Sequence, residues 1–384
     1  MAKKKTWQET LFVKGTYFDY PSLFYVVFLV VFGLMMIYSA SSFVASRDYH
    51  GNSTYYVIRQ LLFCGMGFVG AYVLSKIRYQ VFKRFTWLFY FTELGLLIAV
   101  FLFGTATNGS VRWIRIAGVR FQPSELAKIV IILYMAHVCS TRVRAMETIK
   151  GTLEMMFPAF LLIGIIAIEN LSTGIICAGI AVVIWLVTTP KLRYVFVVII
   201  IGVLGVVGMV LLQSYRSDRI EAWFNPETSP NGYQTMQGLY AIGSGGLFGR
   251  GLGQSIQKLG FIPEAQNDMI FSIICEELGI IGAVGLIVVF LMLIWRFKFI
   301  AEGAPDRYGS LIVVGVIAHL SIQVLINMCV VTNLIPNTGV TLPFISYGGT
   351  SLVSLIGEMG IVLGVSRQIE PISVSERKRI RSNR

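Results

Sequence analysis

Residues 21–45 have the sequence PSLFYVVFLVVFGLMMIYSASSFVA, and no charged side chain interrupts it. About 20 apolar residues in a helix are enough to cross the ~30 Å hydrocarbon core of a bilayer. Lipid offers backbone amides no hydrogen-bond partners, so a segment of this kind satisfies them internally as a helix. The stretch therefore predicts a transmembrane helix and indicates a membrane protein.

Similar runs recur along all 384 residues, of which 55% are hydrophobic and 14% charged. Soluble domains carry about 25% charged residues, so lipid is the expected solvent for most of this chain. We predict an all-α integral membrane protein of about ten transmembrane helices. The turn after the fifth contains only Glu169 and Asn170 and must be tight. The spans expected after the first are 55–76, 85–104, 123–140, 153–168, 171–188, 194–212, 269–295, 310–331 and 341–365.

Every second segment between the spans lies on the same side of the membrane. Lysine and arginine are concentrated in one of these two sets of segments. Cytoplasmic loops carry this excess, so both termini are predicted to be cytoplasmic. We expect a cytoplasmic segment 1–20, a ten-helix domain 21–366, and a basic tail 367–384 that touches anionic membrane lipid. The net charge of +12 is thus a topology signal, and no nucleic-acid partner is expected.

Two segments on the opposite side are longer than a simple connection needs, residues 105–122 and 213–268. The second is a large extracytoplasmic loop between helices 7 and 8. Loops of such length are usually functional. We therefore expect the functional surface on the extracytoplasmic side.

The first long segment carries Arg112, Arg115 and Arg120 on the side that normally has few arginines. Guanidinium groups match phosphate oxygens, although contact with lipid headgroups explains these arginines equally well. Glu125 and Lys128 follow, three residues apart, so they share a helix face and can pair. A charge in an apolar stretch is costly and usually functional, with a purely structural ion pair as the alternative.

The large loop ends at Asp268, directly before the next apolar run. A carboxylate there is a natural helix N-cap. The functional alternative is a general base at the membrane surface, for which Glu264, Glu276 and Glu277 are nearby candidates. The glycine-rich residues 243–253 demand tight turns or close approach to a ligand, but they lack the nucleotide-binding pattern GxxxxGK[ST].

Residues 332–351, TNLIPNTGVTLPFISYGGTS, place prolines and glycines where a span should be regular. Irregular backbone at membrane depth is tolerated where it is buried or lines a wet cavity. The segment predicts a substrate groove, with a structural kink as the alternative. Glu93 and Glu358 lie in other spans, and we interpret both as protonated or hydrogen-bonded structural acids because the sequence names no partner for either.

Three segments carry a resemblance to a known family: RWIRIAGVRFQPSELAK at 112–128, YAIGSGGLFGRGLGQSIQKLGFIPEAQNDMIFSIICEELG at 240–279, and LPFISYGGTSL at 342–352. In this order, on ten predicted spans, they resemble the SEDS family (shape, elongation, division and sporulation). The FtsW and SpoVE branch is the most similar. The resemblance extends over nearly the whole chain.

This resemblance implies a peptidoglycan glycosyltransferase in the bacterial cytoplasmic membrane, at the septum. Its substrates would be lipid II and the growing glycan strand. Its partners would be a class B penicillin-binding protein, which is a transpeptidase, and other division proteins. A lipid II flippase or transporter and a non-enzymatic divisome scaffold are the alternatives.

The resemblance also assigns roles to residues, with the family's essential acid falling on Asp268 as the catalytic base. Inversion at the donor sugar needs such a base and positive charge at the leaving pyrophosphate. A divalent cation, Mg or Mn, is inferred from chemistry and family alone, because no ligand cluster can be identified in the sequence. The residues expected to bind substrate are Arg112, Glu125, Lys128, Arg216, Gln257, Lys258, Glu264, Ser346, Gly348 and Gly349.

The chain departs from the family pattern at three places. Asn267 replaces a threonine in PEAQND, and the turn at Glu169 and Asn170 lacks the common proline. Glu358 occupies a position where the family pattern has an apolar or small residue. This last departure concerns the packing of the last span and leaves Asp268 untouched.

Overall fold

The structure is a computed structural model that describes residues 17–107, 110–116, 119–189, 192–211, 214–229 and 232–370. These residues form mostly helices, together with three short strands and one 3-10 turn. The helices are α2 (Tyr20–Asp48), α3 (Tyr55–Lys76), α4 (Gln80–Arg84), α5 (Thr86–Phe103), α6 (Pro123–Thr141), α7 (Ile149–Glu169), α8 (Leu171–Thr188), α9 (Leu192–Leu211), α10 (Ser214–Phe224), α11 (Tyr233–Gly245), α12 (Ile270–Gly303), α13 (Arg307–Val331) and α14 (Gly349–Ser366).

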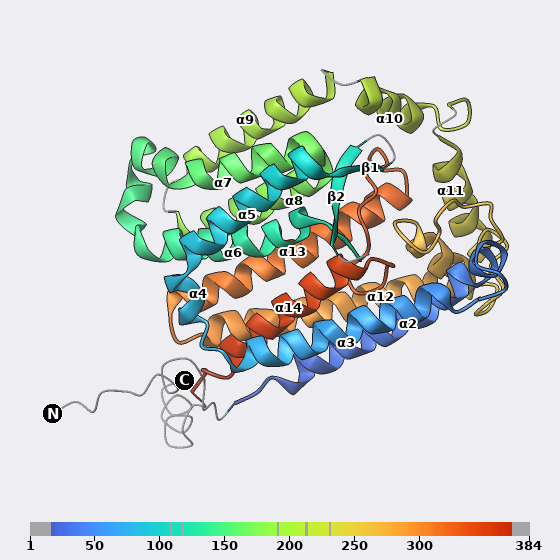
Figure 1. The fold of residues 1–384 in the computed structure, drawn as a ribbon, viewed down its shortest axis with the longest axis horizontal. Coiled ribbons are helices and arrows are strands. Elements are labelled where there is room, and N and C mark those ends of the chain that lie inside the picture. The colour runs from blue at the N-terminus through green and yellow to red at the C-terminus, as the bar shows by residue number, and fades with distance from the viewer. Residues whose placement is uncertain are drawn as a thin grey trace.

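Long apolar helices run side by side and form the body of the molecule (Figure 1). In the described part of the chain, nine are long and apolar enough to cross a membrane: α2, α3, α5, α6, α7, α8, α12, α13 and α14. The tenth predicted span corresponds to α9, which contains a shorter apolar stretch, Phe196–Met209. Large apolar side chains such as Phe24, Leu62 and Phe103 point outward, as expected for contact with lipid. The chain is a multi-pass membrane protein, as predicted.

Helix α13 lies in the interior, where it contacts α6, α8, α12 and α14, while α14 packs along α3. Helix α2 begins and α14 ends at the same end of the bundle (Figure 1). There the Arg367 guanidinium lies 4.7 Å from the centre of the Phe18 ring. Both ends of the membrane domain are therefore on one side.

The predicted tight turn between the fifth and sixth spans is confirmed. A single residue, Asn170, separates α7 from α8, and its side chain caps α8 by accepting a 3.3 Å hydrogen bond from the Thr173 amide. The last predicted span was too long at its start, because α14 begins only at Gly349 and residues 341–348 are irregular. Prolines and glycines in that segment prevent a regular helix.

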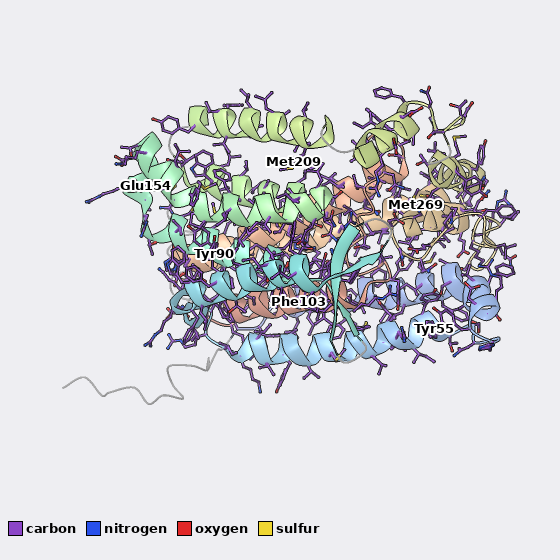
Figure 2. All side chains as sticks on the ribbon, turned by 45° about the horizontal axis from the view of Figure 1, so that its top comes forward. Tyr55, Tyr90, Phe103, Glu154, Met209 and Met269 are labelled. Atoms are coloured by element: carbon purple, nitrogen blue, oxygen red, sulfur yellow. The ribbon has the colours of Figure 1, made fainter. Side chains whose placement is uncertain are left out.

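Both long loops contain structure that the sequence analysis did not predict. The described residues of the first long loop form a three-stranded antiparallel sheet of β1 (Thr105–Thr107), β2 (Ser110–Ile116) and β3 (Val119–Phe121), an addition to the all-α prediction. Residues 213–268 include α10 and α11. Figure 2 shows Met269, which follows this loop, at the same end of the bundle as Tyr55 and far from Glu154.

The glycine-rich segment that follows α11 packs against a break in α12. The break lies at Gly279, whose φ of 67° is not helical. Backbone groups freed there are satisfied from the glycine-rich segment, where the Arg250 amide donates to the Glu276 carbonyl at 2.9 Å. Gly249 has a φ of +77°, and a Cβ on it would overlap the Glu277 carbonyl. The glycines thus serve close backbone approach.

Candidate active site

Asp268 lies between the large loop and α12. The N-cap residue of α12 is Met269, and no side chain caps this helix, so Asp268 is not the N-cap that its position suggested. Its Oδ1 instead accepts a hydrogen bond from Gln234 Nε2 of α11 at 3.3 Å. Asp268 is half-buried.

Two asparagine side chains position Asp268, one through its backbone and one through Gln234. Asn327 Nδ2 of α13 donates both to the Asp268 carbonyl at 2.8 Å and to the Val340 carbonyl at 2.7 Å. Asn337 Nδ2 donates to Gln234 Oε1 at 3.1 Å, so the same glutamine bridges Asn337 and the carboxylate. Asp268 therefore sits where α11, α13 and the irregular segment meet.

The surroundings of Asp268 change its acidity. Burial raises the pKa of its carboxyl from 3.8 to about 6, and the nearby Glu264 carboxylate contributes to the rise. Arg219 and the hydrogen bond from Gln234 act in the opposite direction. A carboxylate with this pKa is ionised at neutral pH yet more basic than usual, as a general base should be.

Glu125 and Lys128 form the ion pair that their spacing predicted. Lys128 Nζ lies 2.9 Å from Glu125 Oε2, and their side chains are 2% and 12% exposed. Pro123 occupies the first turn of α6, and Glu125 lies in that turn, where the helix dipole favours an acid. Lys128 also donates to Gln323 Oε1 of α13 at 3.2 Å. The ammonium is thus buried and shared between two helices.

A stripe of buried polar residues on α13 was missed by the sequence analysis. His319, Gln323 and Asn327 follow one another at intervals of four residues and therefore share a helix face. All three are buried. The signal was present in the sequence, because polar residues repeating at helical spacing inside an apolar span mark an interior face.

Glu358 has a partner that the sequence could not name. His319 Nδ1 lies 2.8 Å from Glu358 Oε2, and both residues are fully enclosed. The interpretation of Glu358 as a hydrogen-bonded acid is therefore confirmed. Glu93 is also buried, but its Oε1 has no hydrogen-bond partner among the described residues.

Glu276 and Glu277 are fully buried and anchor residues 255–258, which directly follow the glycine-rich segment. Glu276 accepts from the Ser255 hydroxyl and from the Ile256 amide at 3.0 Å. Glu277 Oε1 accepts from Lys258 Nζ at 2.9 Å. Lys258, expected to bind substrate, thus has its ammonium in an internal ion pair.

The other predicted substrate-binding residues are spread over the same end of the molecule. Arg112 is half-buried and donates from Nε to the Glu169 carbonyl at 3.2 Å. The side chain of Arg216, on α10, lies outside the described residues. Glu264 is exposed and accepts from Asn267 Nδ2 at 2.7 Å, which gives the Asn267 departure a structural role. Gln257 is half-buried, and its backbone N–H donates a hydrogen bond to Glu276 Oε2 at 3.4 Å.

Ser346, Gly348 and Gly349 belong to the irregular segment and to the start of α14. Ser346 Oγ accepts from the Leu342 amide at 2.8 Å, and Gln60 of α3 bonds to the backbone of Ser346 and Gly348. A small, partly open recess is lined by Ser346, Gly348 and six other residues of 341–355. This recess lies where the sequence analysis predicted a groove.

A sequence profile of the FtsW/RodA/SpoVE cell cycle proteins matches residues 20–370. The chain belongs to this family. The resemblance to the SEDS family, drawn above from three segments, is thereby confirmed.

Members of the FtsW/RodA/SpoVE family from several bacteria are similar to the chain over most of its length. It is 39% identical over 358 residues to stage V sporulation protein E of Bacillus subtilis, covering 90% of this chain and 97% of that protein. It is 37% identical over 357 residues to a probable peptidoglycan glycosyltransferase FtsW of Trichlorobacter lovleyi, covering 91% and 93%.

Solved structures of the FtsW/RodA/SpoVE family have the same fold. A chain of a peptidoglycan synthase complex that coordinates polymerization and crosslinking is 25% identical, with a TM-score of 0.77, covering 92% of this chain and 99% of that one. The rod shape determining protein RodA of Thermus thermophilus gives a TM-score of 0.68 at 25% identity, covering 92% and 98%.

Proposed function

We propose that the protein is a peptidoglycan glycosyltransferase that polymerises lipid II into β-1,4-linked glycan strands and releases undecaprenyl pyrophosphate. The observation that carries this proposal is Asp268, a half-buried carboxylate with a raised pKa that Gln234 and Asn327 hold in place. The relatives support it, since one is named a probable peptidoglycan glycosyltransferase and a structural neighbour belongs to a peptidoglycan synthase complex.

The reaction inverts the donor carbon, because lipid II is α-linked and the polymer is β-linked. Asp268 takes the proton of the acceptor GlcNAc 4-hydroxyl while that oxygen attacks C1 of the donor MurNAc. The bond from C1 to the pyrophosphate oxygen breaks, and Arg112 and Lys128 stabilise the negative charge that develops there. General-base assistance contributes roughly 10²–10⁴-fold in rate, and alignment of two membrane-anchored substrates contributes much of the remainder.

A divalent cation, Mg or Mn, is part of the proposal as a substrate-bridging ion. Among the described residues no three His, Cys, Asp or Glu side chains form a metal-binding group. Magnesium is often held by one or two carboxylates together with substrate phosphates. Because Asp268 as the base must keep its carboxylate free to take a proton, such an ion would be held mainly by the substrate phosphates. The ion would neutralise charge on the pyrophosphate.

The proposed topology has ten spans, both termini in the cytoplasm, and the 105–122 and 213–268 segments outside. The excess of lysine and arginine in alternate loops supports this orientation. Asp268 then lies at the outer membrane surface, where lipid II is polymerised. A septal location is proposed from the similarity to FtsW and SpoVE.

A class B penicillin-binding protein is the proposed partner. The structural neighbour belongs to a complex that coordinates polymerization and crosslinking, which supports pairing with a transpeptidase. Other division proteins would join this pair at the septum.

The test is polymerisation of labelled lipid II by the purified protein together with its transpeptidase partner, comparing wild type with Asp268→Asn. The variant keeps the size of the side chain and an acceptor for Gln234, but it cannot take a proton. We expect the rate of polymer formation to fall by roughly 10²-fold or more.

Asp218→Asn is the matched control, because Asp218 lies in the same loop and its side chain is exposed. This variant should polymerise as well as wild type. A near wild-type rate for Asp268→Asn would remove Asp268 from the base role.

One observation favours the rival function, a lipid II transporter: Lys128 of α6 and the polar stripe of α13 are buried inside the bundle. Charged and polar groups inside a bundle often line a transport path. Polymer made by the purified pair would support the transferase. Lipid II flipping in vesicles without polymer would support the transporter. The absence of both activities would support the scaffold.

A further inference from the structure

Five side chains from three helices form one hydrogen-bonded chain inside the bundle. Glu125 and Lys128 lie on α6, His319 and Gln323 on α13, and Glu358 on α14. The donor–acceptor distances from Glu125 to Glu358 are 2.9, 3.2, 2.8 and 2.8 Å. All members except Glu125 expose 2% of their surface or less. The proposed reaction uses Lys128 but gives no role to His319 and Glu358.

Gln323 is the centre of this chain, and its orientation is fixed from two sides. Its Nε2 donates to the Thr341 carbonyl at 3.0 Å, and a carbonyl can only accept. Its Oε1 faces the Lys128 ammonium, which can only donate. Oε1 must therefore be the acceptor for both Lys128 and His319.

This orientation determines the protons of the buried pair. His319 Nε2 faces an acceptor and must carry a hydrogen. His319 Nδ1 faces the Glu358 carboxyl at 2.8 Å, so one further proton lies between them. The pair is then neutral overall, either as imidazolium with carboxylate or as imidazole with carboxylic acid. Burial favours this state, because an unpaired charge there would be very costly.

We propose that His319 and Glu358 are positioning residues, which act through Gln323 to hold the Lys128 ammonium and residues 341–348 in one geometry. The inference rests on the proposed function, in which Lys128 stabilises the pyrophosphate and the irregular segment borders the recess. Glu358 keeps His319 in the form that donates from Nε2. His319 thereby keeps Gln323 Oε1 directed at Lys128 and Gln323 Nε2 directed at Thr341.

Two variants of nearly equal volume separate positioning from space filling. Glu358→Gln can donate its amide hydrogen to His319 Nδ1, so the Nε2 hydrogen remains directed at Gln323. Glu358→Met fills the same space but donates nothing. We expect Glu358→Gln to polymerise lipid II within about twofold of wild type, and Glu358→Met to lose roughly tenfold or more in kcat, the scale of one hydrogen bond to a charged group.

Hydrogen exchange provides a readout that does not require activity. The amides of residues 341–348 in the full chain, in detergent, should exchange faster in Glu358→Met than in Glu358→Gln or wild type. Gln323→Leu should produce the same acceleration, and adding Glu358→Met to it should change little further, because both act through one side chain.

The alternative outcomes are distinct. Equal exchange in the Met and Gln variants would overturn the positioning role. A wild type that makes no polymer with its partner would contradict the proposed function, while the exchange measurement would still decide this inference. Should Glu358→Met not fold, the double variant His319→Leu/Glu358→Met leaves no unpaired polar atom at this pair and takes its place in both assays.

Discussion

Asp268 illustrates how tertiary packing changes the chemistry of one residue. In sequence it is an ordinary acid before a helix, and as an N-cap it would be a weak base. In the structure it does not cap α12, and burial raises its pKa to about 6. Gln234 and Glu264 influence that pKa in opposite directions. These opposing effects allow a test at the scale of single residues.

The pH dependence of polymerisation should report the pKa of Asp268. The base acts only when ionised, so kcat/KM should be about half its maximum near pH 6, level off about one pH unit above that value and fall below it. Rates of lipid II polymerisation between pH 5 and 8 would check this. A rate without such an acid limb, constant down to pH 5, would show that burial does not raise the pKa of Asp268.

Two substitutions should move this acid limb in opposite directions. Glu264→Gln removes a neighbouring negative charge, so the pKa of Asp268 should fall and the limb should shift to lower pH. Gln234→Leu removes a hydrogen bond to the carboxylate, so the limb should shift to higher pH. Shifts in the same direction would contradict the electrostatic account.

At the scale of elements, the glycine-rich segment and α12 are built as one unit. The break at Gly279 leaves backbone groups unsatisfied, and the glycine-rich segment supplies their partners. The carboxylates of Glu276 and Glu277 then hold the residues that directly follow, Ile256 and Lys258. These glycines were predicted to serve tight turns or close approach to a ligand. The structure shows turns with positive φ at Gly249, Gly251 and Gly253 and also a role that was not predicted, close approach of two backbones.

Gly249→Ala should destabilise the protein, whereas Gly243→Ala should not. Gly249 has a positive φ, and a Cβ on it would overlap the Glu277 carbonyl, while Gly243 is helical with open space around it. We expect a loss of roughly 2 kcal/mol or more in unfolding free energy for the first, and little change for the second. Thermal unfolding in detergent would measure both, and equal melting temperatures would contradict the packing.

At the scale of the whole molecule, the fold brings two long loops and the irregular segment to one end of a helical bundle. In Figure 2, Met269 and Tyr55 lie at this end of the bundle, and Glu154 lies at the opposite end. The buried polar stripe of α13 runs inward from Asp268, through Asn327 and Gln323, to His319. Buried polar side chains thus extend from Asp268 into the interior of the bundle.

The proposed orientation predicts which end is accessible from outside the cell. In a variant without native cysteines, Gln254→Cys should react with a membrane-impermeant maleimide in intact cells, because residue 254 is exposed in the large loop. Lys150→Cys is the matched control at the opposite end, with a side chain 88% exposed. Lys150→Cys should react only after the membrane is permeabilised. The reverse pattern of labelling would show that the proposed orientation is wrong.

Local sequence patterns were enough to predict the long apolar helices, the tight turn at Asn170 and the pairing of Glu125 with Lys128. Hydropathy is a property of each segment alone, and residues three apart on a helix must share a face. The partners of residues far apart in the sequence could not be predicted in this way. Gln234 contacts Asp268, and His319 contacts Glu358 although the two are 39 positions apart. Their hydrogen bonds exist because packing brings the helices together, and no local pattern encodes which helices meet.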